Sequence, residues 1–495
     1  MSFSEDICKL VKESSDPLLA AADRWERVPL GAVAAVINGF PWKSDRFGTD
    51  QGVPLIRIRD VTTGATQTLY DGPIVEGYWV ESGDILVGMD GDFNVGRWKS
   101  GRGLLNQRVC KVIAVPTFYT ASFLEYALPP YLRLVNQMTS SVTVKHLSSR
   151  TLAELPLPLP PVAEQRRIVG KLDVLIARLV RARTELGRVS MMTPSQRLAL
   201  LRSAMSGSMT ESWRTGRELE PIAAMLNRVP VPKQGRGGRE ATDKVLAGKA
   251  GLAINDPGVE LPQGWAWVPL LRIAKQETGH TPSRSQPGYW DGGVPWIGIR
   301  DAGAHHGRII DTTMQTISKE GLANSSARLL PAGTVCLSRT ASVGYVTMMG
   351  RSMATSQDFA TWTCTEALEP EYLMYALMAE GDDIRKFGMG STHTTIYFPE
   401  IRALHIALPP IEEQREIVKR LKAGLARADR LEAEATRARA LLDRLEAAIL
   451  AKAFRGELVP QDPNDEPASV LLDRIRAERA AAPKPKRGRA RKAVG

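Results

Sequence analysis

The feature that most constrains this 495-residue chain is an internal duplication. The segment from Pro160 to Arg166 returns as Pro409 to Arg415, an offset of 249 residues, and Trp25 returns as Trp265 at an offset of 240. Solenoid repeats recur every 20 to 50 residues or so, whereas this period is about the size of a domain. One domain-sized unit has therefore been duplicated once. Two similar domains, each followed by a spacer of matched length, favour a protein with two recognition surfaces over an enzyme with one active site.

The spacer in each copy has the pattern of a coiled-coil helix. Apolar residues recur with 4-3 spacing from Ile168 to Val189 and from Ile417 to Ile449, the latter seam including Leu431 and Leu445. A proline pair precedes each run, and Thr193-Pro194 predicts a break in the first. We expect helices near 164–192, 195–206 and 412–454. Equal spacing to Gly207 and to Gly456 favours packing of the two helices on each other; separate surface helices are the alternative.

The segments before these spacers read as α+β domains. Short β runs broken by Gly, Pro, Asn and Asp predict a twisted antiparallel sheet in each. The predicted strands are Val53–Ile58, Asp84–Val87, Val109–Val115, Val294–Ile299, Thr334–Leu337 and Phe359–Cys364. Short helices are expected at Ala121–Leu128 and Glu371–Ala379. Trp25 and Trp265, in matched positions at strand starts, are expected in the core.

Polar loops between the predicted strands differ between the copies. Arg, Lys, Gln, Asn, Ser and Thr are the side chains that bond base edges and phosphates, although any single one is more often a solvated loop residue. The candidate DNA contacts of the first copy are Trp42, Lys43, Arg97, Lys99, Asn106, Gln107, Arg108 and Lys145. Those of the second copy are Thr281, Ser283, Arg284, Tyr289, Ser338, Arg339, Thr340, Gln357, His393 and Thr394.

The charge balance favours a polyanionic partner. The net charge is +11, with much of the excess in two linker-like stretches, Arg228 to Lys249 and Lys484 to Lys492. Solvated linkers without a nucleic-acid role are the alternative. The N-terminus does not read as a signal peptide and no long apolar run occurs, so we expect a cytoplasmic protein. The four cysteines form no C-x-x-C pair and are expected to be buried thiols rather than metal ligands or disulfides.

Motifs for unaided catalysis are missing from the sequence. It contains no G-x-x-x-x-G-K-[ST] phosphate loop and no H-E-x-x-H metal pair. The stretch Leu128 to Tyr131 looks like a methyltransferase Asn/Asp-Pro-Pro-aromatic motif, but Leu128 cannot accept a hydrogen bond from a target amine. We therefore expect no catalytic residue, no metal site and no cofactor on this chain.

Together these motifs resemble the specificity subunits of type I restriction–modification systems. The resemblance rests on the Leu-Pro-Pro-x-x-Glu-Gln-Arg-x-Ile-Val box of both copies, on Ala453 to Leu458, and on Gly279 to Arg284 with Tyr289-Trp290. It extends over both repeats, from Trp25 to Arg476. The first copy departs from it where Phe40 to Asp45 replaces a Thr-Pro-Ser-Arg type of loop.

The resemblance implies two α/β target-recognition domains in a pseudo-twofold arrangement, separated by two long antiparallel coiled-coil helices. It implies a non-catalytic subunit that reads a bipartite asymmetric DNA target, one half per domain. The implied division is an N-terminal segment (1–24), a first target-recognition domain (25–158), a first conserved coiled-coil region (159–215), a helix and basic linker (216–257), a second target-recognition domain (258–407), a second conserved coiled-coil region (408–460), and a C-terminal helix and basic tail (461–495).

The resemblance also implies partners. Two modification subunits would use S-adenosylmethionine to methylate adenine, and restriction subunits would use ATP and Mg²⁺ to translocate and cut DNA. The coil and the segments around two glycines would form the docking surface. Its candidate residues are Glu164, Gln165, Arg166, Gly207, Glu413, Gln414, Arg415, Phe454 and Gly456.

Three alternatives remain open from the sequence. A related type II system that cuts on both sides of its target uses a similar specificity subunit. A coiled-coil scaffold that binds proteins would show no salt-dependent DNA affinity and no base preference. A self-sufficient methyltransferase would need the cofactor loop that is missing here.

Overall fold

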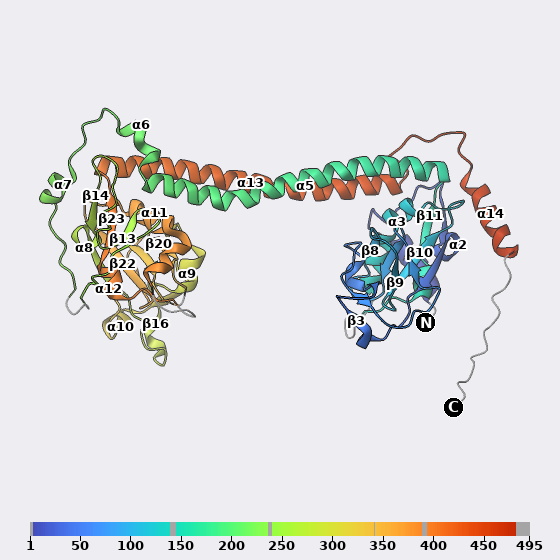
Figure 1. Ribbon diagram of the computed structural model, residues 1–495, viewed down its shortest axis with the longest axis horizontal. Coiled ribbons are helices and arrows are strands. Elements are labelled where there is room, and N and C mark those ends of the chain that lie inside the picture. Colours follow the sequence, from blue (N-terminus) through green and yellow to red (C-terminus); the bar gives the residue numbers. More distant parts are fainter. Residues whose placement is uncertain (1–2, 139–144, 236–239, 341, 389–393, 482–495) are drawn as a thin grey trace. The chain divides into compact units, whose positions relative to one another are not determined.

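The computed structural model describes residues 3–138, 145–235, 240–340, 342–388 and 394–481. It divides into two compact units: unit 1 comprises Met1–Glu185 with Arg437–Gly495, and unit 2 comprises Leu186–Thr436. Two helices of 44 residues, α5 (Val162–Met205) and α13 (Ile411–Phe454), each contribute one part to each unit (Figure 1).

Unit 1 is built on one four-stranded sheet and one five-stranded sheet. The first, antiparallel throughout, has the order β2 (Ala34–Asn38), β10 (Val109–Ala114), β7 (Ile85–Gly88) and β8 (Val95–Arg97). The second has the order β3 (Phe47–Gly48), β5 (Leu69–Tyr70), β4 (Val53–Ile56), β9 (Gly103–Leu105) and β6 (Trp79–Val80). A further pair joins β1 (Glu26–Pro29) to β11 (Pro156–Leu159).

Helices of unit 1 pack against the first sheet and against the β1–β11 pair. They are α1 (Phe3–Glu13), α2 (Leu30–Val33), α3 (Ala121–Met138), α4 (Ser149–Ala153) and α14 (Ala468–Ala481), with 3-10 turns at Ser44–Arg46 and Ile58–Asp60. Val112 of β10, Phe123 of α3, Leu172 of α5 and Phe454 of α13 share one buried cluster. The long helices are thus anchored in the same core as the sheet.

Helix α3 is ten residues longer than predicted. It continues through Pro129 and Pro130, at which the sequence predicts an end. An internal proline removes a backbone hydrogen bond, at a cost of about 3 kcal/mol. Burial of Leu128, Tyr131 and Leu132 on the core side of the helix offsets that cost.

Unit 2 contains three sheets. The largest has the order β15 (Ala274–Thr278), β22 (Phe359–Cys364), β19 (Val335–Ser338), β20 (Val346–Met349) and β17 (Ile309–Ile310). The second has the order β18 (Gln315–Ile317), β16 (Trp290–Ile297) and β21 (Ala354–Thr355). The third has the order β12 (Leu246–Ala247), β13 (Leu252–Ile254), β23 (Leu404–Leu408) and β14 (Ala266–Pro269).

Short helices surround these sheets in unit 2. They are α6 (Glu211–Arg214), α7 (Ile222–Arg228), α8 (Leu270–Ile273), α9 (Ile299–Ala304), α10 (Lys319–Ala323), α11 (Pro370–Glu380) and α12 (Phe398–Arg402), with 3-10 turns at Ser208–Thr210, Pro287–Tyr289 and Gly381–Phe387. Trp362 of β22, Tyr372 of α11 and Leu421 of α13 share the main buried cluster. The α+β class is confirmed. The expectation of a purely antiparallel sheet is wrong, because β4 pairs with β9, β16 with β21 and β17 with β20 in parallel.

Helices α5 and α13 pack on each other within each unit. In unit 1, Arg183 of α5 pairs with Asp443 at 2.7 Å and with Glu446 at 2.5 Å. In unit 2, Arg197 of α5 pairs with Asp429 at 2.6 Å. Residue numbers on α13 fall as those on α5 rise, so the helices run antiparallel.

One prediction about these helices is wrong. The expected break at Thr193-Pro194 does not occur, since Pro194 lies inside α5. Pairing of Arg183 and of Arg197 with α13 holds the helix on either side of this proline. The seam leucines Leu431 and Leu445 are 45% and 49% exposed, because a pair of helices covers each seam residue from one side only.

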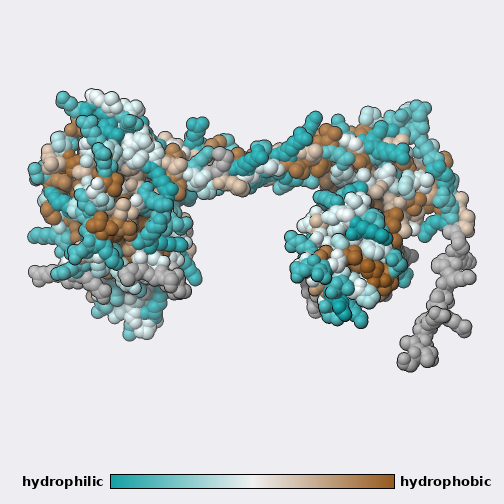
Figure 2. Space-filling view, viewed as in Figure 1, coloured by the Kyte–Doolittle hydropathy of each residue, from teal (hydrophilic) through white to brown (hydrophobic). Residues whose placement is uncertain are grey.

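The prediction of four buried cysteines also needs correction. Cys110 and Cys336 are buried and Cys364 is partly buried, but Cys8 on α1 is exposed, since it faces away from the core residues Ile7 and Val11. Burial raises the pKa of the Cys110 thiol to about 12. Figure 2 shows hydrophilic side chains over most of the visible surface of each unit. Within the described ranges, no helix is both long and apolar enough to cross a bilayer.

Candidate nucleic-acid interface

The candidate contacts of unit 2 gather where three strands of its largest sheet begin or end. Strand β15 ends at Thr278 opposite Ala360, and β19 ends at Ser338 opposite Phe359, where β22 begins. Because these neighbours are antiparallel, the loops that follow β15 and β19 meet the loop that precedes β22. We call loops 279–289, 339–340 with 342–344, and 355–358, together with segment 394–398, the loop edge of unit 2.

Hydrogen bonds tie these loops to one another. The Arg339 amide donates to the Asp358 carbonyl at 2.8 Å, and the Arg339 carbonyl accepts from the Ile396 amide at 2.9 Å. The Thr281 hydroxyl donates to Oε1 of Gln357 at 2.6 Å. The Thr340 hydroxyl donates to Asp358 at 2.6 Å. The structure therefore brings Thr281, Arg339, Thr340 and Gln357 together on one rigid backbone.

Arg339 is the half-buried cation of this edge. Its guanidinium lies over the Phe398 ring, 4.3 Å from the ring centroid, and one N–H donates to the Gln357 carbonyl at 3.1 Å. Burial lowers the pKa of Arg339, and the nearby charge of Asp358, which raises that pKa, offsets only part of the effect. Its Nε has no acceptor in the described protein. An oxygen-rich ligand would complete the bonding of this group.

Arg284 is the exposed cation of the same edge. It stacks on Trp290, with 4.3 Å between the guanidinium carbon and the ring centroid, and donates to Gln315 at 3.1 Å. Ser283 is exposed beside it, and its carbonyl accepts from the Trp290 indole at 3.2 Å. Tyr289 and Thr394 are half-buried. Stacking on a fixed ring reduces the entropy that Arg284 loses when it binds a ligand.

Unit 1 has an edge of the same construction. Strand β2 ends at Asn38 opposite Cys110, and β7 ends at Gly88 opposite Val109, where β10 begins. We call loops 39–43, 89–94 and 105–108, with segment 145–147, the loop edge of unit 1. Lys43, Gln107 and Arg108 are exposed on it. The Lys145 ammonium is half-buried and donates to the Asn136 carbonyl at 2.7 Å.

Asp90 lies on the unit 1 edge and binds the side chains of Arg108 and His146. Its carboxylate is 10% exposed, while the Arg108 and His146 side chains that bond to it are 59% and 65% exposed. Burial would raise the pKa of Asp90, but the hydrogen bonds and charges of His146 and Arg108 hold it below its usual value. The ionised carboxylate thus holds the outward-facing side chains of Arg108 and His146.

The two edges share a backbone framework and differ in side chains. A Cβ on Gly39 would lie 2.0 Å from the Asn106 carbonyl oxygen, and one on Gly279 would lie 1.9 Å from that of Thr355. Only glycine allows these close approaches. The Leu147 amide donates to Met89 at 2.7 Å, as the Ile396 amide does to Arg339 at 2.9 Å.

Side chains at matched positions of this framework carry different chemistry. Asp90 of unit 1 stands where Thr340 stands in unit 2, and Arg108 stands where Asp358 stands, both at an offset of 250 residues. Acceptor and donor are thus exchanged between the two edges. Two edges of this kind present different patterns to a ligand.

Several predicted contacts do not face outward on the loop edges. Trp42 is a buried residue of an aromatic cluster, and its indole donates to the Leu105 carbonyl at 3.0 Å. Arg97 pairs with Glu125 at the opposite end of β7, because it faces Ile85 rather than Gly88; Lys99 follows it. Buried Asn106 and Ser338 shape turns: Asn106 accepts from the Gln107 amide, and Ser338 accepts from the Tyr345 amide. His393 lies outside the described residues.

Asp90, His146 and Phe398 are edge residues that the candidate set missed. A carboxylate is not an expected neighbour of a polyanion, and Phe398 reads as core. The repeat offset that aligns Asp90 with Thr340 was the available signal. No group of three or more His, Cys, Asp or Glu side chains in the described part of the chain could hold a metal ion.

The Glu-Gln box forms a buried clamp in each unit rather than a docking surface. Glu164 and Glu413 each accept from a tryptophan indole at 3.0 Å, that of Trp25 and of Trp265 respectively. Each also binds one arginine at 2.5 Å, Arg24 in unit 1 and Arg214 in unit 2.

Gln165 and Gln414 complete the clamps. The Gln414 amide donates to the carbonyls of Ala367 at 3.0 Å and Pro409 at 2.9 Å, and accepts from the Glu369 amide at 2.8 Å. Gln165 makes the equivalent bonds to Phe118, Pro160 and Thr120. All four box residues are at most 2% exposed, so the expectation that they contact a partner is wrong.

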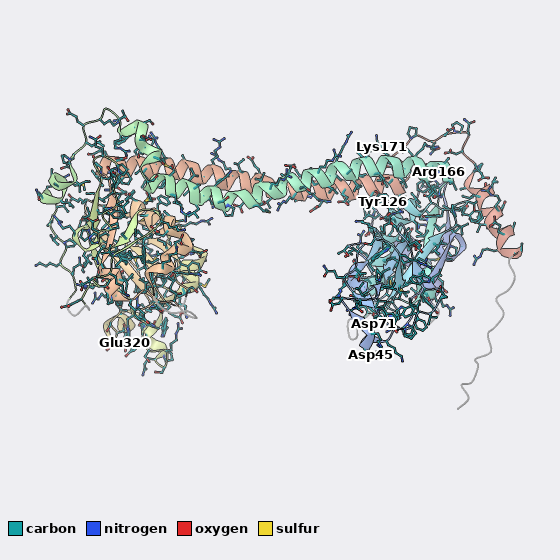
Figure 3. The ribbon with its side chains drawn as sticks, in the orientation of Figure 1. Asp45, Asp71, Tyr126, Arg166, Lys171 and Glu320 are labelled. Carbon is teal, nitrogen blue, oxygen red and sulfur yellow. The ribbon has the colours of Figure 1, made fainter. Side chains whose placement is uncertain are left out.

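Three further docking candidates, Gly207, Phe454 and Gly456, lie at the C-terminal ends of the long helices. Gly207 and Gly456 have φ of +73° and +66°, the left-handed conformation that stops a helix at its C-terminus. Phe454 is buried in the core of unit 1. Arg166 and Arg415 remain exposed. Figure 3 shows Arg166 and Lys171 on α5, near Tyr126 of α3, whose hydroxyl donates to Asp173 of α5 at 2.7 Å.

Comparisons with known proteins agree with this geometry. A family model described as the type I restriction modification DNA specificity domain matches residues 22–186 and 262–438. The chain is 33% identical to the type I restriction enzyme EcoBI specificity subunit of Escherichia coli, over 97% of this chain and 98% of that one. It is 24% identical to the EcoKI specificity subunit of E. coli K12, over 92% and 96%.

Solved structures resemble the chain as well. The HsdS subunit from Thermoanaerobacter tengcongensis matches with a TM-score of 0.54 at 20% identity, over 88% of this chain and 98% of that one. A chain from a study of complex assembly and conformational transition in the type I R-M system matches with a TM-score of 0.61 at 21% identity, over 89% and 100%. At these identities the likeness shows the fold alone.

Proposed function

The chain belongs to the type I restriction–modification DNA specificity family, whose members are the non-catalytic DNA-recognition subunits of type I restriction enzymes. From this we propose how the chain reads DNA. Each loop edge contacts one half of a bipartite, asymmetric target. The contacts we assign to unit 1 are Lys43, Gln107, Arg108 and Lys145. Those we assign to unit 2 are Thr281, Ser283, Arg284, Tyr289, Arg339, Thr340, Gln357 and Thr394.

One observation carries this proposal: the same backbone framework presents different side chains in the two units. Asp90 with Arg108 occupies the place of Thr340 with Asp358. Because the base edges of the major groove differ in their donors and acceptors, two different edges select two different half-site sequences. Exposed Lys43 and Arg284 supply cationic groups that attract the phosphates.

We assign the spacing of the half-sites to α5 and α13. At about 1.5 Å per residue, a helix of 44 residues is about 66 Å long. In this proposal the paired helices set the gap between the half-sites. The domain limits proposed are 25–158 and 258–407 for the recognition domains and 159–215 and 408–460 for the coil.

The partners we propose are two modification subunits and, through them, restriction subunits. Exposed Arg166 and Arg415, one beside each buried clamp, are the docking residues that remain from the box. S-adenosylmethionine, ATP and Mg²⁺ would bind to those partners. An assembly that acts on cellular DNA in this way works in the cytoplasm.

Mapping of methylated adenines tests the proposal. The full chain, assembled with its modification subunit, is given plasmid DNA, and the methylated sequence is read for the wild type, Arg339→Ala and Arg108→Ala. Arg339→Ala should relax one half-site and Arg108→Ala the other. Equal relaxation of both halves by either variant contradicts independent reading, and a wild type without any sequence preference contradicts the function itself.

A further inference from the structure

Glutamine occupies the same framework position in both loop edges. Gln357 precedes β22 and Gln107 precedes β10, at an offset of 250 residues. Both are exposed, and each follows a buried polar residue, Ser356 or Asn106, that is bonded into the turn. A rigid turn thus presents one side-chain amide to the outside in each unit.

The two amides differ in how they are held. The Thr281 hydroxyl donates to Oε1 of Gln357 at 2.6 Å, which holds the side-chain amide in one position on the loop edge. The backbone carbonyl of Gln357 accepts from Arg339 at 3.1 Å, which fixes the turn below it. Gln107 makes no side-chain hydrogen bond to any described residue; its backbone amide donates to the Phe40 carbonyl at 3.0 Å.

A fixed amide offers an acceptor and a donor side by side. Oε1 of Gln357 keeps a second lone pair, and Nε2 keeps its N–H groups. In the major groove only adenine presents a donor, N6–H, next to an acceptor, N7. Guanine presents two acceptors there, while cytosine offers only the N4–H donor and thymine only the O4 acceptor. The chemistry of the held amide therefore matches adenine.

We propose that Gln357 reads an adenine in the half-site of unit 2, with Thr281 as its positioning residue. The inference rests on the proposed function, since it requires the loop edge to face DNA. Gln107 is the counterpart in the half-site of unit 1. Because no hydroxyl orients its amide, it discriminates less strongly at its base pair than Gln357 does.

The test changes the donor pattern of Gln357 while keeping its shape. In Gln357→Glu the side chain only accepts, which suits the N4–H donor of cytosine. The full chain, assembled with its modification subunit, is challenged with a randomised duplex library, and the bound and methylated sequences are read. The preferred base should change from adenine to cytosine at one position of one half-site, by about tenfold or more. Gln357→Ala should leave that position without preference.

Two further variants separate the contributions. Thr281→Val removes the orienting hydroxyl and should weaken the adenine preference at the same position without replacing it by another base. Gln263→Glu adds the same charge on an exposed loop of unit 2 away from the edge and should leave every position unchanged. Melting temperatures of all variants should match that of the wild type, since the altered side chains are not buried.

The outcomes distinguish this inference from the function it rests on. If the wild type selects a bipartite sequence and Gln357→Glu selects the same sequence at every position, the inference is wrong and the function stands. If the wild type selects no sequence, the proposed function fails first. A change that appears equally in Gln263→Glu is an effect of charge and also overturns the inference.

Discussion

Replacement of Gln414 with alanine should destabilise unit 2 by about 3 to 5 kcal/mol. The side chain is fully buried and makes three hydrogen bonds, to the carbonyls of Ala367 and Pro409 and from the Glu369 amide. Each lost bond costs about 1 kcal/mol, and a buried backbone group left without a partner costs about 1 to 3 kcal/mol. Water that enters the space left by the side chain recovers part of that cost.

Hydrogen exchange measured by mass spectrometry on the full chain locates the effect. The start of α11 and the junction of β23 with α13 should lose protection, because the three bonds join these elements. Gln165→Ala makes the matched change in unit 1 and should act on the start of α3 instead. Gln263→Ala, on an exposed loop, serves as the control. A loss below about 1 kcal/mol, or equal loss of protection in both units, would refute the clamp.

Three more outcomes follow from the structure. Asp90 has a lowered pKa, so its ionised form stabilises unit 1 at neutral pH, and that contribution is lost as the pH falls through the folded-state pKa. The difference in unfolding free energy between wild type and Asp90→Asn, measured in urea, should therefore shrink below about pH 4. A constant difference down to pH 2 or so would count against it. Gly279→Ala places a Cβ against the Thr355 carbonyl and should abolish reading of one half-site in methylation mapping, whereas loss of both halves would argue against separate edges. Removing one heptad from both α5 and α13 should change the gap between half-sites but not the half-sites, and an unchanged gap would exclude the coil as a spacer.

The sequence predicts the fold class and the long helices well because both depend on periodicity. The 4-3 spacing of apolar residues is a local property, and it survives Pro194, whose cost is met by pairing with α13. Helix α3 likewise continues through Pro129 and Pro130, where the sequence predicts an end. A local rule cannot weigh the tertiary contacts that override it.

The site was predictable only in part, because residue type does not reveal which ends of the strands meet. Arg97 and Arg108 are alike in sequence context, yet one lies at each end of the sheet. Trp42 and the Glu-Gln box have the polar or aromatic character of contacts but form internal bonds. Strict repetition of the box reflects the geometry of a buried clamp.

Cys8 on α1, the one exposed cysteine of the four, can be labelled selectively. Burial raises the pKa of the thiols of Cys110, Cys336 and Cys364, which leaves them protonated and poorly reactive at neutral pH, whereas Cys8 is open to solvent. A maleimide fluorophore should therefore label the native chain at one position without mutagenesis. With a second dye on a DNA end, energy transfer would report the orientation in which the chain lies along its target.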